Sequence, residues 1–472
     1  MVGITAYGAY VPLFRLDRRA IGNRGEKAIC NFDEDSVTMA VEAVADCLKG
    51  RDRNVVDALY YGTTTSLYKE HSEAVTVAAA SDLRDDVYTA EMGNSLRAGT
   101  MALKAAVDAV KAGSSKAAVA VAADCRLGNP GSSLEQNFGD GAAAVMIGDG
   151  EVGAAVEGSY SVCNEIMDVW RTNGDAYVRT WEDRFVAERG YIPSMHQAVV
   201  GLMERFNYKP ADFQKVVFYS PDGRRGAEVA RRLGFNPSAL QDPLIDQMGN
   251  TGAASALMLL VSALEEAKAG DLILLASYGN GADAFALRAT ENIDKIRGQA
   301  LGMKGHLSSK RLVDDYLRYL RWRGIVPIDK SAAAPVASYS SVVAKREYDR
   351  TIRLRGSRCK ACEYVQFPAQ RVCTHCRAKD QMEPYSFTGQ TGKVFSYTLD
   401  YISPLVELPI ATAEVDFEGG GRIQCYMTEV DVQKIEIGMP VQMTFRRHKL
   451  WEEIPLRDGV YTYFWLAKPL RA

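Results

Sequence analysis

The sequence predicts an α/β protein with two halves of comparable layout, followed by a cysteine-rich metal module and a small antiparallel β barrel. Three observations predict this organisation. Short β-like runs alternate with small-residue helical segments over residues 1–290, the pattern of layered α/β folds. Two C-x2-C pairs follow, Cys359–Cys362 and Cys373–Cys376. Residues 386–470 are then rich in β-branched and aromatic residues with glycines between them, as in small barrels.

Residues 1–165 form the first predicted half. Apolar runs without polar alternation indicate strands that are buried on both faces, whereas the alanine-rich stretch with apolar residues on one side indicates a helix. The predicted elements are a strand over 55–61, a helix starting at 73, a helix over 99–112 and buried strands over 117–123 and 141–147.

The second half, residues 206–295, repeats this layout without a clean sequence repeat, which suggests an internal duplication. Residues 166–205 separate the two halves; they contain Trp170, Trp181 and several charged residues, and we expect an insertion that covers a surface. The second α/β stretch is predicted to begin with a helix over 195–206, at the end of that segment. A strand over 215–219, a helix over 226–233, a glycine-rich turn over 248–252, a helix over 253–268 and a strand over 272–277 are predicted to follow.

Residues 296–340 are predicted to form a polar helical arm, Ser308–Arg323, and a linker at 329–341 that is rich in alanine and serine with one proline. The aromatic and basic residues of the arm are compatible with a solvated amphipathic helix or with a docking surface for the next domain. Residues 341–384 and 385–472 are the predicted metal module and barrel.

The spacing Cys359-x2-Cys362-x10-Cys373-x2-Cys376 predicts a tetrahedral Zn²⁺ site, since two C-x2-C knuckles a short loop apart supply four thiolates. Four thiolates leave no open position, so the zinc is expected to be structural. Two disulfides or a redox-active C-x-x-C are the alternatives. The absence of a secretory signature weakens both.

Composition limits the remaining function classes. The chain of 472 residues is 47% hydrophobic and 24% charged, as in ordinary globular proteins. A net charge of −3 gives no pull toward nucleic acid, and no apolar run is long enough for a membrane span. We therefore expect a cytoplasmic protein that binds neither nucleic acid nor membrane. Neither G-x-x-x-x-G-K-[ST] nor a well-placed G-x-G-x-x-G is present, which argues against nucleotide hydrolysis and dinucleotide redox chemistry.

Three polar segments stand where α/β sheets hold functional groups. Tyr219 ends the strand in VVFYSPDGR, Asn250 lies on the tight turn MGNTGAAS, and SYGNGADA, with Ser277 and Gly279, follows another strand. Each segment alone is also compatible with a core tyrosine or with glycines that only the backbone geometry requires.

Together these segments resemble the thiolase superfamily, specifically its hydroxymethylglutaryl-CoA synthase branch of the archaeal type. The likeness covers about residues 1–325 and rests on FYSPDGRRGAEVARRLGF, MGNTGAAS and ASYGNGADAF, with AEMGNSLRAGT upstream. The tail resembles the zinc-ribbon and OB-fold module that accompanies such enzymes. The resemblance implies a duplicated core of α-β-α-β-α layers, an acyl-CoA thioester as substrate and a homodimer.

The catalytic positions of that family differ in this chain. The nucleophilic cysteine corresponds to Leu96, the basic histidine to Tyr219 and the catalytic glutamate, by a loose alignment, to Thr64. The oxyanion-side asparagine is matched by Asn250. Because leucine supplies no thiolate, the usual acyl-enzyme cannot form at position 96.

These departures predict an acyl-CoA aldolase or retro-aldolase that works through an enolate, similar to the thiolase-like retro-aldolases that rely on tyrosines. Tyr219 is expected to move the proton of the β-hydroxyl, and Asn250 to hold the thioester oxygen. An acyltransferase of the synthase type with a relocated nucleophile and a non-catalytic acyl-CoA-binding scaffold are the alternatives.

Several other polar residues are predicted to assist in acid–base chemistry or in CoA binding. His71 is predicted to be a second acid or base, with simple exposure as the alternative. Arg224 and Arg225 are predicted to contact the CoA phosphates, with solvated helix charges as the alternative. Ser277 and Gly279 are predicted CoA contacts. Ser95 lies beside Leu96, but a serine without a paired histidine is poorly activated.

Overall fold

The structure is a computed structural model that describes residues 1–297, 300–326, 339–402, 407–447 and 459–471. It contains two compact units. The first unit comprises Met1–Cys30, Asp35–Ala78 and Arg84–Tyr316, and the second comprises Asn31–Glu34, Ala79–Leu83 and Leu317–Ala472. None of the helices in the described part of the chain has the length and apolarity needed to cross a bilayer.

The first unit is built on a nine-stranded sheet with the order β11-β12-β13-β8-β1-β7-β6-β4-β5. The pairs β4–β5, β4–β6 and β11–β12 are parallel, and the other pairs are antiparallel. The strands are β1 (Gly3–Tyr10), β4 (Ala58–Gly62), β5 (Tyr88–Met92), β6 (Ala117–Asp124), β7 (Gly141–Gly148), β8 (Ala154–Cys163), β11 (Lys215–Phe218), β12 (Leu272–Tyr278) and β13 (Gly281–Ala289).

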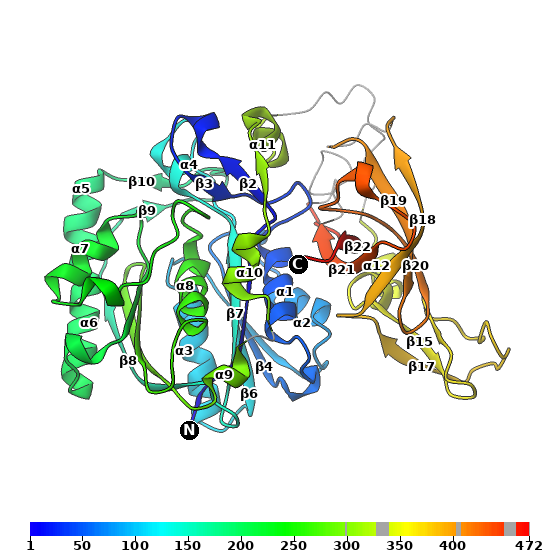
Figure 1. Ribbon diagram of the computed structural model, residues 1–472, viewed down its shortest axis with the longest axis horizontal. Helices are drawn as coiled ribbons and strands as arrows, with labels where there is room; N and C mark the ends of the chain where they lie inside the picture. Colours follow the sequence, from blue (N-terminus) through cyan, green and yellow to red (C-terminus); the bar gives the residue numbers. More distant parts are fainter. Residues whose placement is uncertain (298–299, 327–338, 403–406, 448–458, 472) are drawn as a thin grey trace. The chain divides into compact units, whose positions relative to one another are not determined.

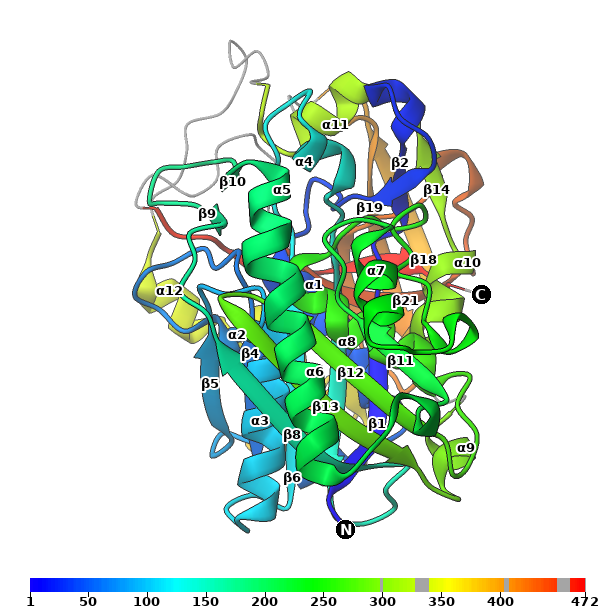
Figure 2. The same ribbon diagram turned by 90° about the vertical axis from the view of Figure 1, so that its left-hand side faces the viewer.

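Each half of the unit contributes strands to this sheet. Helices lie on the outer side of the strands of both halves and also between the two halves. Helices α3 (Ala98–Lys111) and α8 (Ser255–Leu264) pack on each other and on strands of the two halves. Helix α8 is apolar on every side and all of its residues are buried, as expected for a central helix. Figures 1 and 2 show α6 (Ile192–Phe206) on the outer side of β8 and β13, and α1 (Ser36–Cys47) covers β1 and β7. The predicted layers are therefore confirmed.

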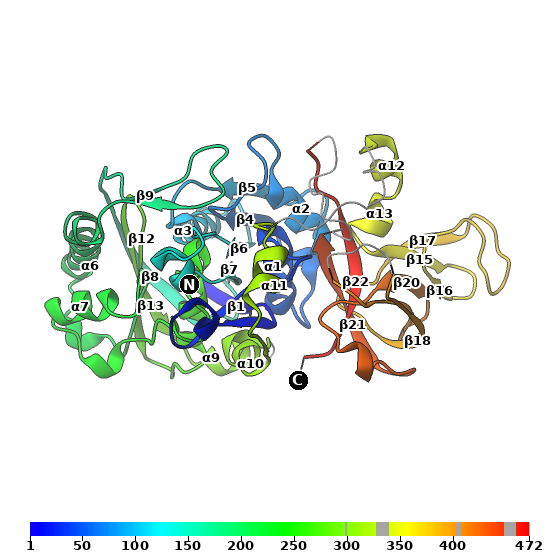
Figure 3. The same cartoon turned by 90° about the horizontal axis from the view of Figure 1, so that it is seen from above.

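The local predictions for the first unit are largely confirmed. The apolar runs at 117–123 and 141–147 are β6 and β7, every residue of which is buried. The predicted helices at 73, 99–112, 226–233 and 253–268 are α2 (Glu73–Ala80), α3, α7 (Arg225–Arg232) and α8. Figure 3 shows α6 and α7 side by side at one edge of the unit. Within the predicted insertion lie the two-residue strands β9 (Val169–Trp170) and β10 (Arg179–Thr180) and the short helix α5 (Asp183–Phe185).

The prediction of one helical arm over Ser308–Arg323 is wrong. Helix α10 (Gly302–Ser308) ends where the arm was expected to begin, and α11 spans only Tyr316–Trp322. Between them β14 (Arg311–Val313) pairs in parallel with β2 (Phe14–Asp17). The pairing with a strand about 300 residues away outweighs local helix propensity. The β2 strand also pairs with β3 (Glu26–Ala28). Most of the predicted linker lies outside the described residues.

The second unit contains a three-stranded ribbon and a five-stranded barrel. Two short helices, α12 (Ser341–Arg346) and α13 (Tyr348–Thr351), precede the ribbon strands β15 (Arg355–Cys359), β16 (Val365–Gln366) and β17 (Met382–Ser386). The barrel has the strand order β20-β19-β18-β21-β22, and a parallel bridge between Met427 and Ala467 nearly closes it. Its strands are β18 (Thr391–Asp400), β19 (Ile410–Phe417), β20 (Arg422–Tyr426), β21 (Pro440–Arg447) and β22 (Tyr463–Pro469).

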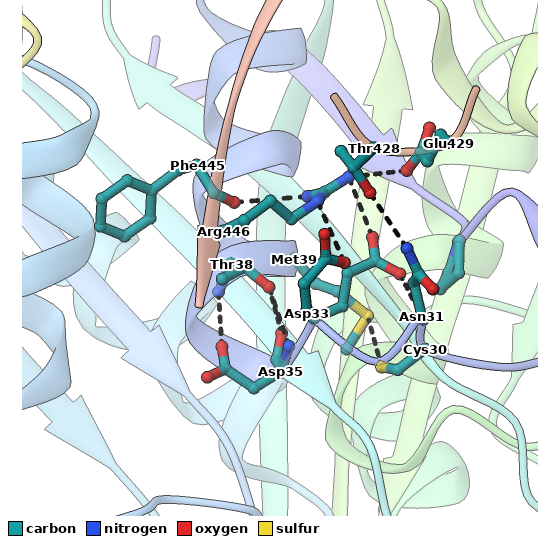
Figure 4. Close-up of polar contacts among 12 residues, drawn as sticks. Cys30, Asn31, Asp33, Asp35, Thr38, Met39, Thr428, Glu429, Phe445 and Arg446 are labelled. Atoms are coloured by element: carbon teal, nitrogen blue, oxygen red, sulfur yellow. Dashed lines mark hydrogen bonds and ion pairs between the residues drawn. The ribbon is translucent and has the colours of Figure 1, made fainter. Parts of the chain in front are cut away.

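A buried charge cluster holds the turn Asn31–Glu34 within the second unit (Figure 4). Arg446 of β21 lies 2.6 Å from Glu429, 3.2 Å from Glu34 and 3.8 Å from Asp33, each distance joining a guanidinium nitrogen to a carboxylate oxygen. The Arg446 side chain is fully buried. Burial raises the pKa of Asp33, and the Arg446 charge opposes that rise. Arg446 therefore faces three buried carboxylates.

Candidate functional site

Tyr219 and Asn250, the two residues predicted to act together, do meet in the first unit. Asn250 Nδ2 donates to the Tyr219 phenol oxygen at 3.1 Å and to the carbonyls of Ser220 and Pro221 at 3.3 Å. Both side chains are buried. Tyr219 directly follows β11, and Asn250 is held by a backbone bond from its own N–H to the Asn137 carbonyl at 2.7 Å. The amide is therefore fixed in place against the phenol.

Arg126 completes this group, although the sequence analysis did not single it out. Its Nη2 donates to Asn250 Oδ1 at 2.8 Å, and its Cζ lies 4.1 Å from the centroid of the Phe138 ring. The residue is only 5% exposed. The signal that could have revealed it was the pair of charged residues at the end of the buried strand β6, where Asp124 is the last strand residue and Arg126 lies two residues beyond.

Asp124, at the end of β6, anchors the loop that corresponds to the family's catalytic glutamate. Its carboxylate accepts from Thr63 Oγ1 at 3.0 Å, Thr64 N at 2.7 Å, Thr64 Oγ1 at 2.8 Å, Thr65 Oγ1 at 3.1 Å and Ala253 N at 2.7 Å. A carboxylate offers about four lone-pair sites. These donors saturate it, so Asp124 positions the threonine loop and is poorly placed to abstract a proton.

Leu96 packs against the apolar cluster that contains Tyr219 and Tyr278. Beside it, Ser95 Oγ donates to the Gly279 carbonyl at 3.0 Å. A Cβ atom at Gly279 would lie 2.6 Å from Ser95 Oγ and 2.8 Å from Leu96 N, so glycine is needed there for close approach. This contact accounts for Gly279 without a CoA molecule, and Ser277 is buried.

The protonation state of Tyr219 follows from its surroundings. Burial raises the pKa of the phenol, whereas the positive charge of Arg126 and the hydrogen bond from Asn250 lower it. Burial dominates and the pKa lies above its ordinary value. Tyr219 is therefore a neutral phenol near pH 7, which suits a proton donor.

The structure does not bring the other predicted residues to this group. His71 is exposed, with its ring edge-on to Tyr68 at a centroid distance of 5.1 Å. Arg224 is exposed, and Arg225 pairs with Asp183 at 2.5 Å and Asp222 at 3.3 Å. Across the described ranges, no hydrogen bond or ion pair joins these three residues to Tyr219 or Asn250.

A buried glutamate near the threonine loop was also missed. Glu73, at the start of α2, is 1% exposed. Its Oε1 accepts from Leu67 N and from Ser66 Oγ, and its Oε2 has no hydrogen-bond partner among the described residues. Burial, together with the charges of Glu91 and Asp35, raises the pKa of Glu73 to about 8.

This raised pKa predicts a pH-dependent stability. Between the ordinary carboxyl pKa and about 8, the unfolded chain is ionised at Glu73 while the folded chain keeps its proton, so stability falls as the pH rises through that range. Glu73→Gln should remove this loss and stabilise the protein above pH 8 by up to roughly 4 kcal/mol. Urea unfolding at pH 5.5 and 8.5 measures the difference. The exposed neighbour Glu70→Gln is the control, and equal pH profiles for wild type and Glu73→Gln would contradict the assignment.

The four cysteines of the second unit form the predicted metal site. Their Sγ atoms all lie within 4.8 Å of one another. The Cys359–Cys376 and Cys362–Cys373 sulfur pairs are each 3.7 Å apart, close to the separation of about 3.8 Å that tetrahedral Zn–S bonds of about 2.3 Å require. A disulfide would need about 2.05 Å. The four thiols therefore fit Zn²⁺ and are not paired as disulfides.

Family models match three parts of the chain. Residues 346–383 match the ChsH2 rubredoxin-like zinc ribbon domain, and residues 386–446 match the ChsH2 C-terminal OB-fold domain. Residues 203–288 match the C-terminal part of 3-oxoacyl-[acyl-carrier-protein] synthase III. The structural zinc ribbon and the OB-type barrel are thus confirmed.

Curated relatives decide the family. A hydroxymethylglutaryl-CoA synthase of Methanopyrus kandleri is 35% identical over 328 residues, which cover 66% of this chain and 93% of that protein. The chain belongs to the hydroxymethylglutaryl-CoA synthase family. A synthase of Thermococcus sibiricus is also 35% identical, over 68% of this chain and 96% of its own length. The family resemblance over the first two thirds of the chain is confirmed.

Solved structures agree on the fold of this family member. A hydroxymethylglutaryl-CoA synthase complexed with CoA has a TM-score of 0.64 at 19% identity, covering 72% of this chain and 94% of that chain. The 3-oxoacyl-[acyl-carrier-protein] synthase III of Aquifex aeolicus has a TM-score of 0.56 at 21% identity, covering 61% and 100%. The core is therefore a thiolase-type fold.

Proposed function

We propose that this protein makes or breaks a carbon–carbon bond beside the thioester of an acyl-CoA, as an aldolase or retro-aldolase without an acyl-enzyme at position 96. Family membership supports acyl-CoA carbon–carbon chemistry. The observations that carry the finer assignment are Leu96 at the position of the family's nucleophile and a buried Tyr219 phenol that is hydrogen bonded to Asn250 at 3.1 Å. The group supplies hydrogen-bond donors and no thiolate.

In the cleavage direction, the β-hydroxyl gives its proton to the Tyr219 phenolate and the Cα–Cβ bond breaks. The electron pair of that bond passes into the thioester, which becomes an enolate, and a carbonyl compound is released. The enolate then takes a proton at Cα to give the shortened acyl-CoA. In the addition direction the steps reverse, and a neutral Tyr219 donates its proton to the carbonyl oxygen of the acceptor. Since burial favours the neutral phenol, Tyr219 is better prepared for addition.

Tyr219→Phe tests this proposal. Loss of the phenol hydrogen should lower kcat about 10²- to 10⁴-fold, the usual contribution of a positioned acid or base, with little change in KM. The assay separates CoA esters by chromatography and mass spectrometry, using acetyl-CoA plus acetoacetyl-CoA in one direction and a panel of β-hydroxyacyl-CoA esters in the other. Tyr88→Phe, at an exposed tyrosine, is the control. Full activity of Tyr219→Phe would exclude this role.

A synthase-type acyltransferase with a relocated nucleophile is the second candidate, and the names of the curated relatives favour it. The observation in its support is Cys125, which is partly exposed and lies between Asp124 and Arg126. Its Sγ is 3.8 Å from Thr65 Oγ1. A 42-Da adduct on Cys125 after incubation with acetyl-CoA, absent in Cys125→Ser and present in Cys163→Ser, would establish this route and exclude the first. An unmodified Cys125 during turnover would exclude the second.

The contacts with the CoA phosphates, the cellular location and the oligomeric state remain predictions. The CoA phosphates are expected near Arg224 and Arg225, because guanidinium groups suit phosphate recognition. The protein is expected to be a cytoplasmic homodimer that assembles through the thiolase-type core. Sedimentation of the purified full chain would measure the oligomeric state.

A further inference from the structure

The side chain of Glu73 closes a largely exposed loop that follows β4. Residues 66–72 connect the threonine loop, Thr63–Thr65, to helix α2, whose first residue is Glu73. Glu73 Oε1 reaches back to the start of this connection, where it accepts from Leu67 N and, at 3.1 Å, from Ser66 Oγ. A single carboxyl group therefore ties the two ends of the connection together.

The threonine loop links this closure to the candidate site. Its three hydroxyl groups donate to the Asp124 carboxylate at 3.0, 2.8 and 3.1 Å. Arg126 lies two residues beyond Asp124 in the chain and donates to Asn250, which in turn donates to the Tyr219 phenol. A displaced threonine loop would therefore disturb the end of β6 that holds Arg126, Asn250 and Tyr219 together.

The surroundings of Glu73 favour its neutral form while the loop is closed. The side chain is 1% exposed, and its Oε2 has no hydrogen-bond partner among the described residues. Glu91 of β5 accepts from Glu73 N at 2.7 Å, Asp35 begins α1 nearby, and the phenol of Tyr61 in β4 is buried beside them. Burial and the two carboxylates raise the pKa of Glu73 to about 8, although the bonds from the loop oppose this rise.

We propose that Glu73 is a positioning residue for the reaction: its carboxyl closes residues 66–72 and thereby holds the threonine loop against Asp124. The inference rests on the proposed function in one respect, that the group formed by Arg126, Asn250 and Tyr219 turns over CoA esters. Opening of the loop hydrates Glu73 and lets it ionise at its ordinary pKa. The open fraction should therefore rise by up to about 10-fold per pH unit until about pH 8, and then level off.

Hydrogen exchange of the full chain tests the closure directly. After correction for the intrinsic pH dependence of exchange, the amides of residues 66–72 in wild-type protein should exchange up to about 10-fold faster per pH unit between pH 5.5 and 7.5. Glu73→Gln should show no such rise, because the amide oxygen accepts the same bonds and does not ionise. Glu70→Gln, at an exposed glutamate of the same loop, should behave as wild type. A corrected rate that stays constant with pH in wild-type protein would overturn the inference.

Turnover of the CoA esters named above tests the link to the reaction. Glu73→Ala should lower kcat about 10- to 100-fold with little change in KM, as expected for a catalytic group displaced from its productive position. Glu73→Gln should retain most of kcat, and Glu70→Ala should change neither constant. Wild-type kcat in Glu73→Ala, or an equal loss in Glu73→Gln, would contradict the positioning role.

The two measurements separate this inference from the proposed function. If wild-type protein turns over none of the esters, the proposed function is wrong, and hydrogen exchange still decides whether Glu73 closes the loop. If turnover is present but exchange of residues 66–72 does not depend on Glu73, the inference is wrong and the proposed function stands. Should Glu73→Ala fail to fold, the comparison of wild type with Glu73→Gln decides both points.

Discussion

Replacing Cys373 by serine is expected to abolish zinc binding and to unfold the ribbon formed by residues 355–386. The ribbon contains very little apolar core of its own: apart from the cysteines, Val365 and Phe367 are its buried hydrophobic residues among those described. Metal coordination must therefore supply the folding energy, which amounts to about 10–16 kcal/mol for structural zinc in small peptides. The loss of a single thiolate removes most of it.

The measurement is the zinc content by mass spectrometry, together with hydrogen exchange of the ribbon amides. Wild-type protein should hold one zinc per chain with protected β15 and β17 amides, and Cys373→Ser should lose both. Cys163→Ser, at an exposed cysteine outside the four, should change neither. A strong chelator should reproduce the Cys373→Ser exchange pattern in wild-type protein. Protected ribbon amides in zinc-free protein would show that the metal is dispensable for the fold.

The parts of the fold that were predictable from sequence are those specified by local pattern. Strands β6 and β7 are continuous apolar runs, and α3 is alanine-rich with one apolar side, so local composition was sufficient. The prediction of a helical arm over Ser308–Arg323 was wrong because Arg311–Val313 pair with Phe14–Leu16 and form a strand. Neither segment carries a signal for the other, since strand pairing over such a separation is decided by the tertiary fold.

The candidate site likewise contains residues that the local sequence predicted and residues whose roles only the tertiary fold shows. Tyr219 and Asn250 were recognised because each stands in a motif whose order along the chain is characteristic of the family. Asp124 ends a different strand, β6, and Arg126 lies two residues beyond it. Their roles emerge only when β6 and the turn at Gly252 come together. Histidine is a common acid or base, and His71 lies near the loop that matches the family's catalytic glutamate. Spacing could not show that its side chain is exposed, whereas Glu73 two residues later is buried.

Arg446→Met is expected to destabilise the second unit by about 3–5 kcal/mol, the cost of breaking a buried ion pair from one side. Methionine approximates the length of the arginine stem, so the change chiefly removes charge. Glu429, Glu34 and Asp33 then lose the cation that lies within 3.8 Å of each. Glu34 and Asp33 must then either stay ionised without this cation or take up protons, whereas Glu429 keeps its pair with Arg471 at 3.0 Å. The defect should therefore shrink as the pH falls from 8 to 5, because protonated carboxyls need no partner.

Hydrogen exchange of the β21 and β22 amides under mild denaturant measures this loss locally, which is preferable to a global transition in a chain of several domains. Arg422→Met is the matched control, because Arg422 pairs with Asp416 at 2.6 Å on the same barrel but is 44% exposed. An exposed pair contributes at most about 1 kcal/mol. If Arg446→Met cost no more than Arg422→Met, the cluster would be hydrated and the buried turn Asn31–Glu34 would depend on packing instead of charge.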